Sequence, residues 1–188
     1  MNRRIALRNL GILTGGMVLL PSCDFSKENA KLTLNKLDIL PSEQSLMKVL
    51  VDTIIPEGDI PGARSLDIDN FVWIMVDDCL KDEDQEQYLM GMKLFENYTK
   101  QVSNNSFSAL NQNEREEVLI GILAIDLNEA TDSDKALNLF VNITKNLTSY
   151  GYMQSEYIMK EVMPYTLVPG KYGSCETIDN SKRINVNG

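Results

Sequence analysis

The three cysteines carry the most reactive side chains of this chain, and their spacing limits the chemistry they can do. Cys23, Cys79 and Cys175 lie more than fifty residues apart, and no Cys-x-x-Cys pair occurs. Zinc ribbons and ordinary iron–sulfur sites use closely spaced cysteines, so neither is expected. Three interpretations stay open for Cys79 and Cys175. Cys79 and Cys175 form a disulfide, or Cys79 is a small buried hydrophobic residue, or Cys175 is free to bridge to another chain.

Acidic residues are the other candidates for chemistry, as general acids or as calcium ligands. Three clusters stand out: Asp67 with Asp69, Asp77-Asp78, and Asp82-Glu83-Asp84. None has the glycine at position 6 and the glutamate at position 12 of an EF-hand. Acids at helix starts are typically solvated charges that favour the helix dipole, and we interpret them so. Glu57 and Asp59 are better site candidates because they lie in a Pro/Gly-rich loop.

The composition excludes several classes of active site. The 188 residues contain no histidine, so Ser-His-Asp triads, Cys-His dyads and histidine-ligated metals are ruled out. With 18 basic and 27 acidic residues the net charge is −9, which predicts no nucleic-acid partner. No glycine-rich phosphate-binding motif occurs. We therefore predict no catalytic, cofactor-binding or metal-binding residue in this chain.

The first 22 residues have the pattern of an export signal. Arg3 and Arg4 resemble a twin-arginine motif and precede an apolar run of 11 residues, too short for a membrane span of about 20. Its last residue begins the sequence Leu20-Pro21-Ser22-Cys23, which resembles a bacterial lipobox and predicts lipidation of Cys23. The alternatives are an ordinary cleaved signal, an uncleaved helix and general secretory export. The predicted location is the periplasmic side of a bacterial cell envelope, with a lipid anchor in the membrane.

The remaining sequence predicts one all-α domain of five to six helices. We divide the chain into an export signal (1–22), a lipidated N-terminus and tether (23–40) and a helical domain (41–188), with an irregular tail from residue 164. Ser42 is the expected cap of the first helix, Asn111 and Thr131 cap later ones, and Gly151 is expected just beyond a helix end. The helix near residues 68–79 has its expected core stripe at helical spacing: Ile68, Phe71, Val72, Met75, Val76 and Cys79.

Several short segments, in order along the chain, together resemble the gluconate 2-dehydrogenase subunit 3 family. They are the leader from Asn2 to Gly11, Val51-Asp-Thr-Ile-Ile-Pro56, Asp59-Ile-Pro-Gly-Ala63, Val76-Asp-Asp-Cys79, Ser106-Phe-Ser-Ala-Leu110, residues 147–156 and residues 165–175. The resemblance implies a small non-catalytic subunit that helps a flavin-dependent sugar or sugar-acid dehydrogenase to mature and cross the membrane. It places FAD in that flavoprotein partner and implies a cytochrome c subunit as a further partner.

Two irregular segments are the expected surfaces for contact with that partner. Residues 57–63 and 164–175 are rich in proline and glycine, and loops of this kind commonly bind partners. The candidate docking residues are Asp59, Pro61, Gly62, Tyr165, Pro169, Gly170 and Tyr172. The alternative function is a stand-alone envelope lipoprotein with a ligand-binding or structural role.

Overall fold

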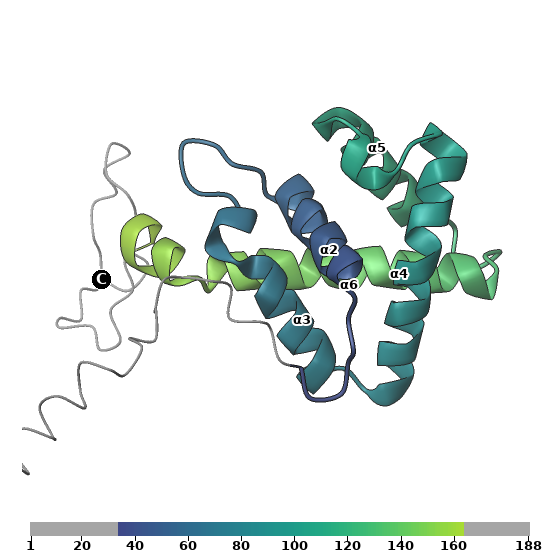
Figure 1. Cartoon of the computed structure of the whole chain (residues 1–188), viewed down its shortest axis with the longest axis horizontal. Helices are drawn as coiled ribbons and strands as arrows, with labels where there is room; N and C mark the ends of the chain where they lie inside the picture. Colours follow the sequence, from purple (N-terminus) through teal and green to yellow (C-terminus); the bar gives the residue numbers. More distant parts are fainter. Residues whose placement is uncertain (1–33, 164–188) are drawn as a thin grey trace, which may run out of the picture. The chain divides into compact units, whose positions relative to one another are not determined.

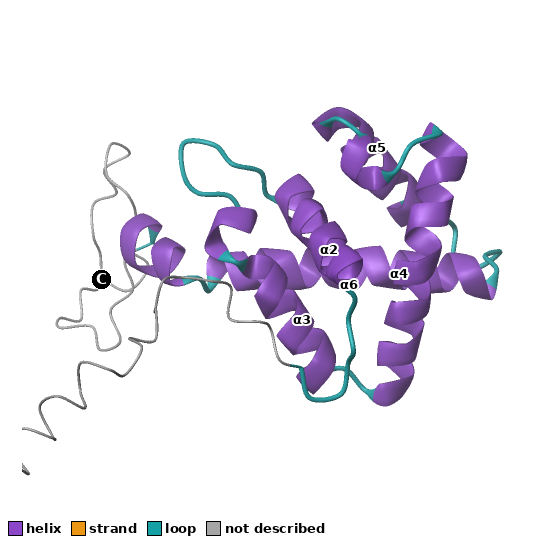
Figure 2. Cartoon of the chain, viewed as in Figure 1, coloured by secondary structure: helices purple, strands orange, loops and turns teal. Residues whose placement is uncertain are grey.

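The computed structural model describes residues 34–163, which fold entirely as helices and connecting loops (Figures 1 and 2). With labels as in Figure 1, the helices are α2 (Pro41–Ile54), α3 (Ile68–Cys79), α4 (Asp82–Ser103), α5 (Gln112–Leu123) and α6 (Asp132–Met153). Shorter turns are η1 (Arg64–Leu66), η2 (Phe107–Ala109) and the π-helical η3 (Ile158–Val162). The all-α prediction is confirmed. No helix of this part of the chain has both the length and the hydropathy to cross a membrane.

Helix α6 is the centre of the fold, because α2, α3, α4 and α5 all pack against it. Figure 1 shows it running along the long axis behind the others. Its closest neighbour is α4, where Gly91 lies so near the backbone of Ala136 that a Cβ atom would overlap the Ala136 carbonyl. Edge-to-face ring pairs fill the space between these helices and η2, and the centroid of the Phe95 ring is 4.9 Å from that of Phe107 and 5.5 Å from that of Phe140.

Local capping signals place most helix starts. Asn111 accepts a hydrogen bond from the Glu114 N–H at 3.1 Å, and the Glu114 carboxylate accepts one from the Asn111 N–H at 2.9 Å. Thr131 and Asp134 make the same reciprocal pair at the start of α6. Both predicted caps are therefore confirmed.

Two predicted helix ends are wrong. The first helix begins one residue before Ser42, at Pro41, and the backbone N–H of Leu40 is bonded to the Glu43 carboxylate. A proline suits the first helical position because its missing N–H would have no partner there. Gly151 is not beyond α6 but inside it, buried, where the Phe71 ring occupies the space of a side chain. Close helix packing, not a turn, explains this glycine.

Helix α3 begins and ends as predicted, but its buried face is rotated from the predicted stripe. Ile68, Val72 and Val76 are buried as expected. The other buried positions are Asp69, Trp73 and Asp77, whereas Phe71 and Met75 are half-buried and Cys79 is exposed. The prediction that Cys79 is a buried hydrophobic residue is therefore wrong, and so is the prediction that Asp69 and Asp77 are solvated capping charges.

The end of the predicted tether is fixed to α3. The Asp77 carboxylate accepts hydrogen bonds from the backbone N–H groups of Asn35, Lys36 and Leu37, at 2.6, 3.0 and 2.8 Å. Burial raises the pKa of Asp77, but these three N–H groups lower it by more, and the net shift is downward. Residues 34–37 therefore run along the helical domain.

Several predictions concern residues outside the described range. These are the export residues Arg3 and Arg4, the lipidation site Cys23, the cysteine Cys175, and the tail residues Tyr165, Pro169, Gly170 and Tyr172. They stay predictions.

Candidate functional site

The loop that joins α2 to α3 is closed on itself. Its two ends meet where the Ala63 N–H donates to the Ile55 carbonyl at 2.9 Å. Gly62 is buried just before this closure, and a Cβ atom there would lie only 2.6 Å from the Glu57 nitrogen and 2.7 Å from the Pro56 carbonyl carbon. Because both neighbours are backbone atoms, only glycine fits. The 55–63 loop therefore has one tightly defined shape.

Glu57, which is itself a residue of the loop, stabilises that shape through its side chain. Its Oε2 atom accepts hydrogen bonds from the Ser65 hydroxyl at 2.6 Å and from the Gly62 N–H at 3.0 Å. The Ser65 hydroxyl, followed by the Gly62 N–H, holds the pKa of Glu57 below its ordinary value. A carboxylate held in its charged form by two donors is a poor general acid. We therefore assign Glu57 a structural role in the loop.

Tyr152 fastens the loop to the central helix. Its hydroxyl, near the C-terminal end of α6, donates to the Pro61 carbonyl at 2.8 Å across 91 residues of sequence. The Tyr152 ring is buried, and burial raises the pKa of its hydroxyl. No local pattern in the sequence predicts this contact, because nothing near Tyr152 indicates which backbone carbonyl its hydroxyl meets.

The predicted docking residues of this loop occupy three different environments. Asp59 is exposed at the tip, Pro61 is half-buried above Tyr152, and Gly62 is buried. Asp59 and Pro61 can meet another protein directly. Gly62 cannot, and its role is to let the loop close.

A polar hollow brings η1, which follows the loop, together with the last turn of the described chain. It lies between η1 and η3 and is lined by Ser65, Leu66, Asp67, Ser155, Glu156, Tyr157, Lys160 and Glu161. Lys160 and Glu156 form an exposed ion pair here. Residue 163, from which the predicted docking tail continues, follows η3 directly. The 55–63 loop, η1 and residues 152–162 thus form one surface, which we call the loop end.

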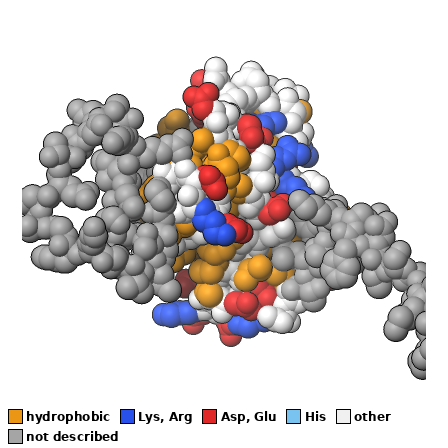
Figure 3. Space-filling view, turned by 90° about the vertical axis from the view of Figure 1, so that its left-hand side faces the viewer, with side chains coloured by type: hydrophobic (Ala, Val, Ile, Leu, Met, Phe, Trp, Pro, Cys, Tyr) orange, Lys and Arg blue, Asp and Glu red, His pale blue; other side chains and the backbone are white. Residues whose placement is uncertain are grey.

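The loop end has both apolar and charged side chains on its surface. Figure 1 shows the loop and η3 at the left of the molecule, and Figure 3 looks onto that side. Hydrophobic side chains form a band there, with acidic and basic side chains among them (Figure 3). The half-buried apolar residues of these segments are Ile60, Pro61, Leu66, Tyr157, Met159 and Val162. Such a mixture is typical of surfaces that bind other proteins.

The first half of α3, which follows η1 in the chain, contains two buried polar atoms without hydrogen-bond partners. Asp69 is 2% exposed and its Oδ1 atom has no hydrogen bond, and the indole N–H of the fully buried Trp73 has none either. Burial raises the pKa of Asp69, against the opposing attraction of Lys48. Asp67, the residue just before α3, has a left-handed backbone at φ 54°. Unpaired groups and unusual backbone of this kind concentrate at functional sites.

Sequence reasoning missed Asp69 because an acid in the first helical turn ordinarily faces water. One signal could have found it. Asp69, Trp73 and Asp77 are spaced four residues apart and therefore lie on one face of the helix. The chain's single tryptophan is more readily buried than exposed, so its neighbours on that face are also expected inside.

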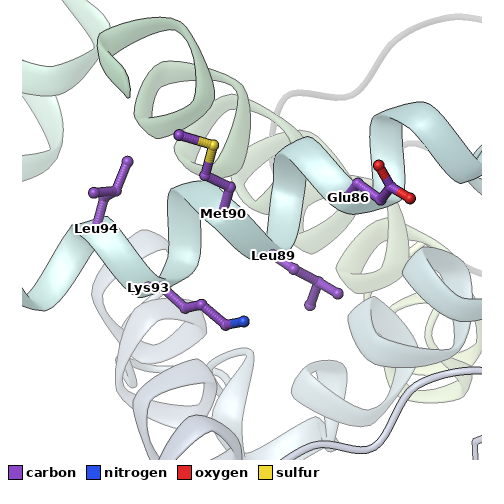
Figure 4. A pocket seen from close by; sticks show the side chains of 5 residues that line it. All are labelled: Glu86, Leu89, Met90, Lys93 and Leu94. Carbon is purple, nitrogen blue, oxygen red and sulfur yellow. The ribbon is translucent and has the colours of Figure 1, made fainter. Parts of the chain in front are cut away.

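Two further hollows lie elsewhere on the described surface. One is on the outer face of α4 and is lined by Glu86, Leu89, Met90, Lys93 and Leu94. Figure 4 shows these side chains leaving a single helix without converging on one point, so they form a helix face and not a binding cleft. The other is an apolar groove between α2, α5 and α6, described further below.

Cys79 lies exposed at the C-terminal end of α3, has no disulfide partner among the described residues, and has the Met75 sulfur 3.8 Å from its own. Because Cys175 is outside the described residues, two interpretations of this cysteine pair stay open. They are an intrachain disulfide and a free Cys175 that bridges to another chain.

Comparison with known proteins identifies the domain. The model of the family described as gluconate 2-dehydrogenase subunit 3 matches residues 41–170, more than half of the chain. The match includes the five α-helices of the described residues, α2 to α6, and the 55–63 loop. No curated protein and no solved structure matches the chain.

Proposed function

The chain belongs to the gluconate 2-dehydrogenase subunit 3 family, and from this premise we propose that it supports export, maturation and anchoring of a catalytic flavoprotein. The family name describes an accessory subunit that associates with a catalytic dehydrogenase subunit. In our proposal that partner holds FAD and oxidises a sugar or sugar acid, this chain does no chemistry itself, and a cytochrome c subunit completes the complex in the bacterial envelope.

The observation that carries the proposal is the shape of the loop end. The 55–63 loop is fixed by its own closure, by Glu57 and by Tyr152, yet its tip is exposed. A surface loop that is rigid before binding loses little conformational entropy when a partner covers it. The exposed carboxylate of Glu57 and the hydroxyl of the buried Tyr152 hold the loop backbone, and in our proposal they perform no reaction. This is what a docking element needs, and it differs from an active site.

The N-terminal residues supply the export and anchoring steps of the proposal. Arg3 and Arg4 direct the chain to the twin-arginine route, which carries folded proteins. A flavoprotein folded around FAD then crosses the membrane bound to this chain, without a signal of its own. Lipid on Cys23 holds the complex at the periplasmic side of the membrane.

Export is tested by replacing both arginines with lysine in the full chain, expressed in its native host. For Arg3→Lys with Arg4→Lys we expect the flavoprotein to stay in the cytoplasm, measured by its flavin absorbance and by mass spectrometry of cell fractions. Arg8→Lys is the matched control, since Arg8 lies in the same basic segment outside the pair. Normal export of the flavoprotein by the double variant would contradict the proposed route.

Anchoring is tested separately with Cys23→Ser. We expect the flavoprotein and this chain to move together from the membrane fraction to the soluble periplasmic fraction. Membrane retention of both proteins in this variant would show that the anchor lies elsewhere in the complex.

Docking at the loop end is tested with Asp59→Lys. Because Asp59 is exposed at the tip, the substitution leaves the fold intact but reverses a charge in the proposed contact. We expect the amount of flavoprotein that copurifies in mild detergent to fall at least about tenfold, the equivalent of about 1.4 kcal/mol. Glu129→Lys, an exposed acid in a loop away from the loop end, is the control. If the wild-type chain copurifies with no flavoprotein, it acts alone and the proposed function fails.

A further inference from the structure

An apolar groove lies between the C-terminal end of α2 and helices α5 and α6. Its apolar lining consists of Ile54, Pro56, Leu119, Ile120, Leu123 and Val141. Glu116 and Lys145 add one charge of each sign, and Thr53 completes the lining. The groove has a volume of about 270 Å³, just below the usual range of small-molecule sites, about 300–1,000 Å³. It therefore suits a few side chains of another protein better than a cofactor.

The groove leaves hydrophobic surface in water. Helix α5 buries Val118, Leu119 and Ile122 against the core. It also carries Ile120 on the opposite side, 64% exposed, which is more than any other large hydrophobic residue of the described chain. In the groove Ile120 adjoins the half-buried Ile54 and Leu123 and the exposed Pro56, so these side chains form one partly exposed apolar patch. Contiguous apolar surface of this kind marks a site for contact with another protein.

The walls of the groove are held in place before anything binds. The side-chain amide of Gln112, in the first turn of α5, donates to the Thr53 carbonyl at the end of α2 at 3.0 Å and to the Glu116 carboxylate at 2.7 Å. On the other side, the Asn138 amide of α6 donates to the Ile122 carbonyl of α5 at 3.0 Å. Each of the three helices is thus tied to a neighbour, and the groove is preformed.

We propose that this groove binds the catalytic dehydrogenase subunit, as the hydrophobic centre of an interface of which the 55–63 loop is the polar edge. This inference rests on the proposed function. Pro56 belongs to both surfaces, since it lines the groove and begins the exposed part of the loop, so the two are continuous. Stable interfaces combine an apolar centre with a polar rim in this way.

The size of a stable interface supports the same partner. A stable complex buries about 800 Å² on each partner, from about 20–30 residues. The exposed tip of the loop is only a few residues, Pro56 to Asp59. The dehydrogenase must therefore cover neighbouring surfaces as well. The rest of the loop end supplies one of them, and the groove is a further apolar surface that continues from Pro56.

The test uses two isoleucines that are both exposed on helices. Ile120→Asp places a charge in the groove, and Ile74→Asp places the same charge on α3, where Ile74 is 43% exposed. Neither side chain is buried, so circular dichroism and thermal melting should show both variants folded like the wild type. Each full-length chain is produced in its native host and purified in mild detergent. The copurified flavoprotein is identified by mass spectrometry and quantified by its flavin absorbance.

We expect Ile120→Asp to reduce the bound flavoprotein at least about tenfold, and Ile74→Asp to leave it within about twofold of wild type. If Ile120→Asp binds as much flavoprotein as the wild type, the groove is not the binding surface, but the proposed function still holds. A loss of bound flavoprotein in Ile74→Asp alone would also contradict the groove and would place the interface on α3. A wild-type chain that self-associates through Ile120, shown by light scattering with and without the substitution, would assign the groove to a second copy instead. Absence of any flavoprotein from the wild-type preparation would overturn both proposals.

Discussion

At the C-terminal end of α3 the buried polar groups have partners, whereas in the first half of the helix the buried Asp69 and Trp73 each have a polar atom without one. Asp77 accepts three backbone N–H groups, and the side chain of Gln85 from α4 donates to the Val76 and Asp77 carbonyls at 2.9 and 3.2 Å. Asp69 and Trp73 each bury an atom with no hydrogen bond. The paired groups at the C-terminal end thus stabilise the fold, whereas the unpaired groups in the first half of the helix lower its stability.

The difference indicates where the molecule tolerates strain. An unpaired buried polar group costs about 1–3 kcal/mol, and such a cost persists where the surrounding structure enforces it. Here the unpaired groups lie in the first half of α3, which follows the 55–63 loop and η1 in the chain, and that loop is closed at Gly62 and fastened by Tyr152. The end of α3 with the costly groups is therefore also the end with the exposed, preformed loop. Substitutions at the two ends should separate these roles.

The largest expected effect is from Gly62→Ala at the N-terminal end. The added Cβ would lie 2.6–2.9 Å from backbone atoms of residues 55–57, so the loop must open. We expect a loss of about 3 kcal/mol in the free energy of unfolding, measured by urea denaturation. Gly58→Ala is the matched control, because no atom lies within 4 Å of its new Cβ. If both variants are equally stable, the loop is not fixed by this contact.

Removing the carboxylate at the other end should have the next largest effect. Asp77→Ala leaves the N–H groups of Asn35, Lys36 and Leu37 without their acceptor, and we expect a loss of about 2 kcal/mol. Hydrogen exchange at these three amides should accelerate at least tenfold. Asp78→Ala is the control, since the exposed Asp78 bonds only the Asn35 side chain. Unchanged exchange would show that residues 34–37 are held by something other than Asp77.

These two cases also show what the sequence could and could not predict. Helix bounds depend on nearby residues, and the Asn111–Glu114 and Thr131–Asp134 caps were readable because each pair is three residues apart. The partners of Asp77 are about 40 residues away, and no local pattern connects them. The same limit applies to Gly151, whose fit against Phe71 depends on how two helices cross.

The rotated face of α3 has a related cause. Apolar periodicity selected Phe71, Met75 and Cys79 because they share a face with Ile68 and Val72. On the other side of the helix, Trp73 is the one large apolar residue and lies between two acids. Judged by hydrophobicity alone, that side is therefore a poorer candidate for the buried face. Trp73 fills the core, and the acids are buried beside it. In the candidate site, the loop and its exposed Asp59 were predictable from proline and glycine content, whereas the Tyr152 contact and the buried Asp69 were not.

A smaller effect is expected where the loop meets α6. Tyr152→Phe removes the hydroxyl that donates to the Pro61 carbonyl but keeps the ring. We expect a loss of about 1 kcal/mol in the free energy of unfolding and faster proteolysis within residues 55–63. Tyr150→Phe, at a ring that is 57% exposed, should change neither quantity. Equal proteolysis of Tyr152→Phe and wild type would mean that loop closure and Glu57 suffice to fix the loop.

The smallest expected effect is a gain in stability, whereas the preceding substitutions are expected to lower it. It comes from Asp69→Asn and allows a direct comparison of the Asp69 and Asp77 carboxylates. Burial raises the pKa of Asp69, so the folded protein binds its proton more tightly than the unfolded chain does. The cost of the charged form is therefore absent below the unfolded pKa of about 3.9, grows as the pH rises above it, and is complete above the folded pKa. Asp69→Asn removes that charge. We expect it to stabilise the protein by about 0.5–1 kcal/mol at pH 7 and not at all near pH 3.

Asp77 should show the reverse pH dependence, because its folded pKa is lowered. Its stabilisation is complete above the unfolded pKa of about 3.9 and is lost as the pH falls through the folded value. The deficit of Asp77→Ala should therefore shrink in acid, while the gain of Asp69→Asn appears only toward neutral pH. Urea denaturation of both variants from pH 3 to 7 measures the two curves. If Asp69→Asn is destabilising at pH 7, the charged carboxylate is favourable where it lies, and attraction to Lys48 outweighs its burial.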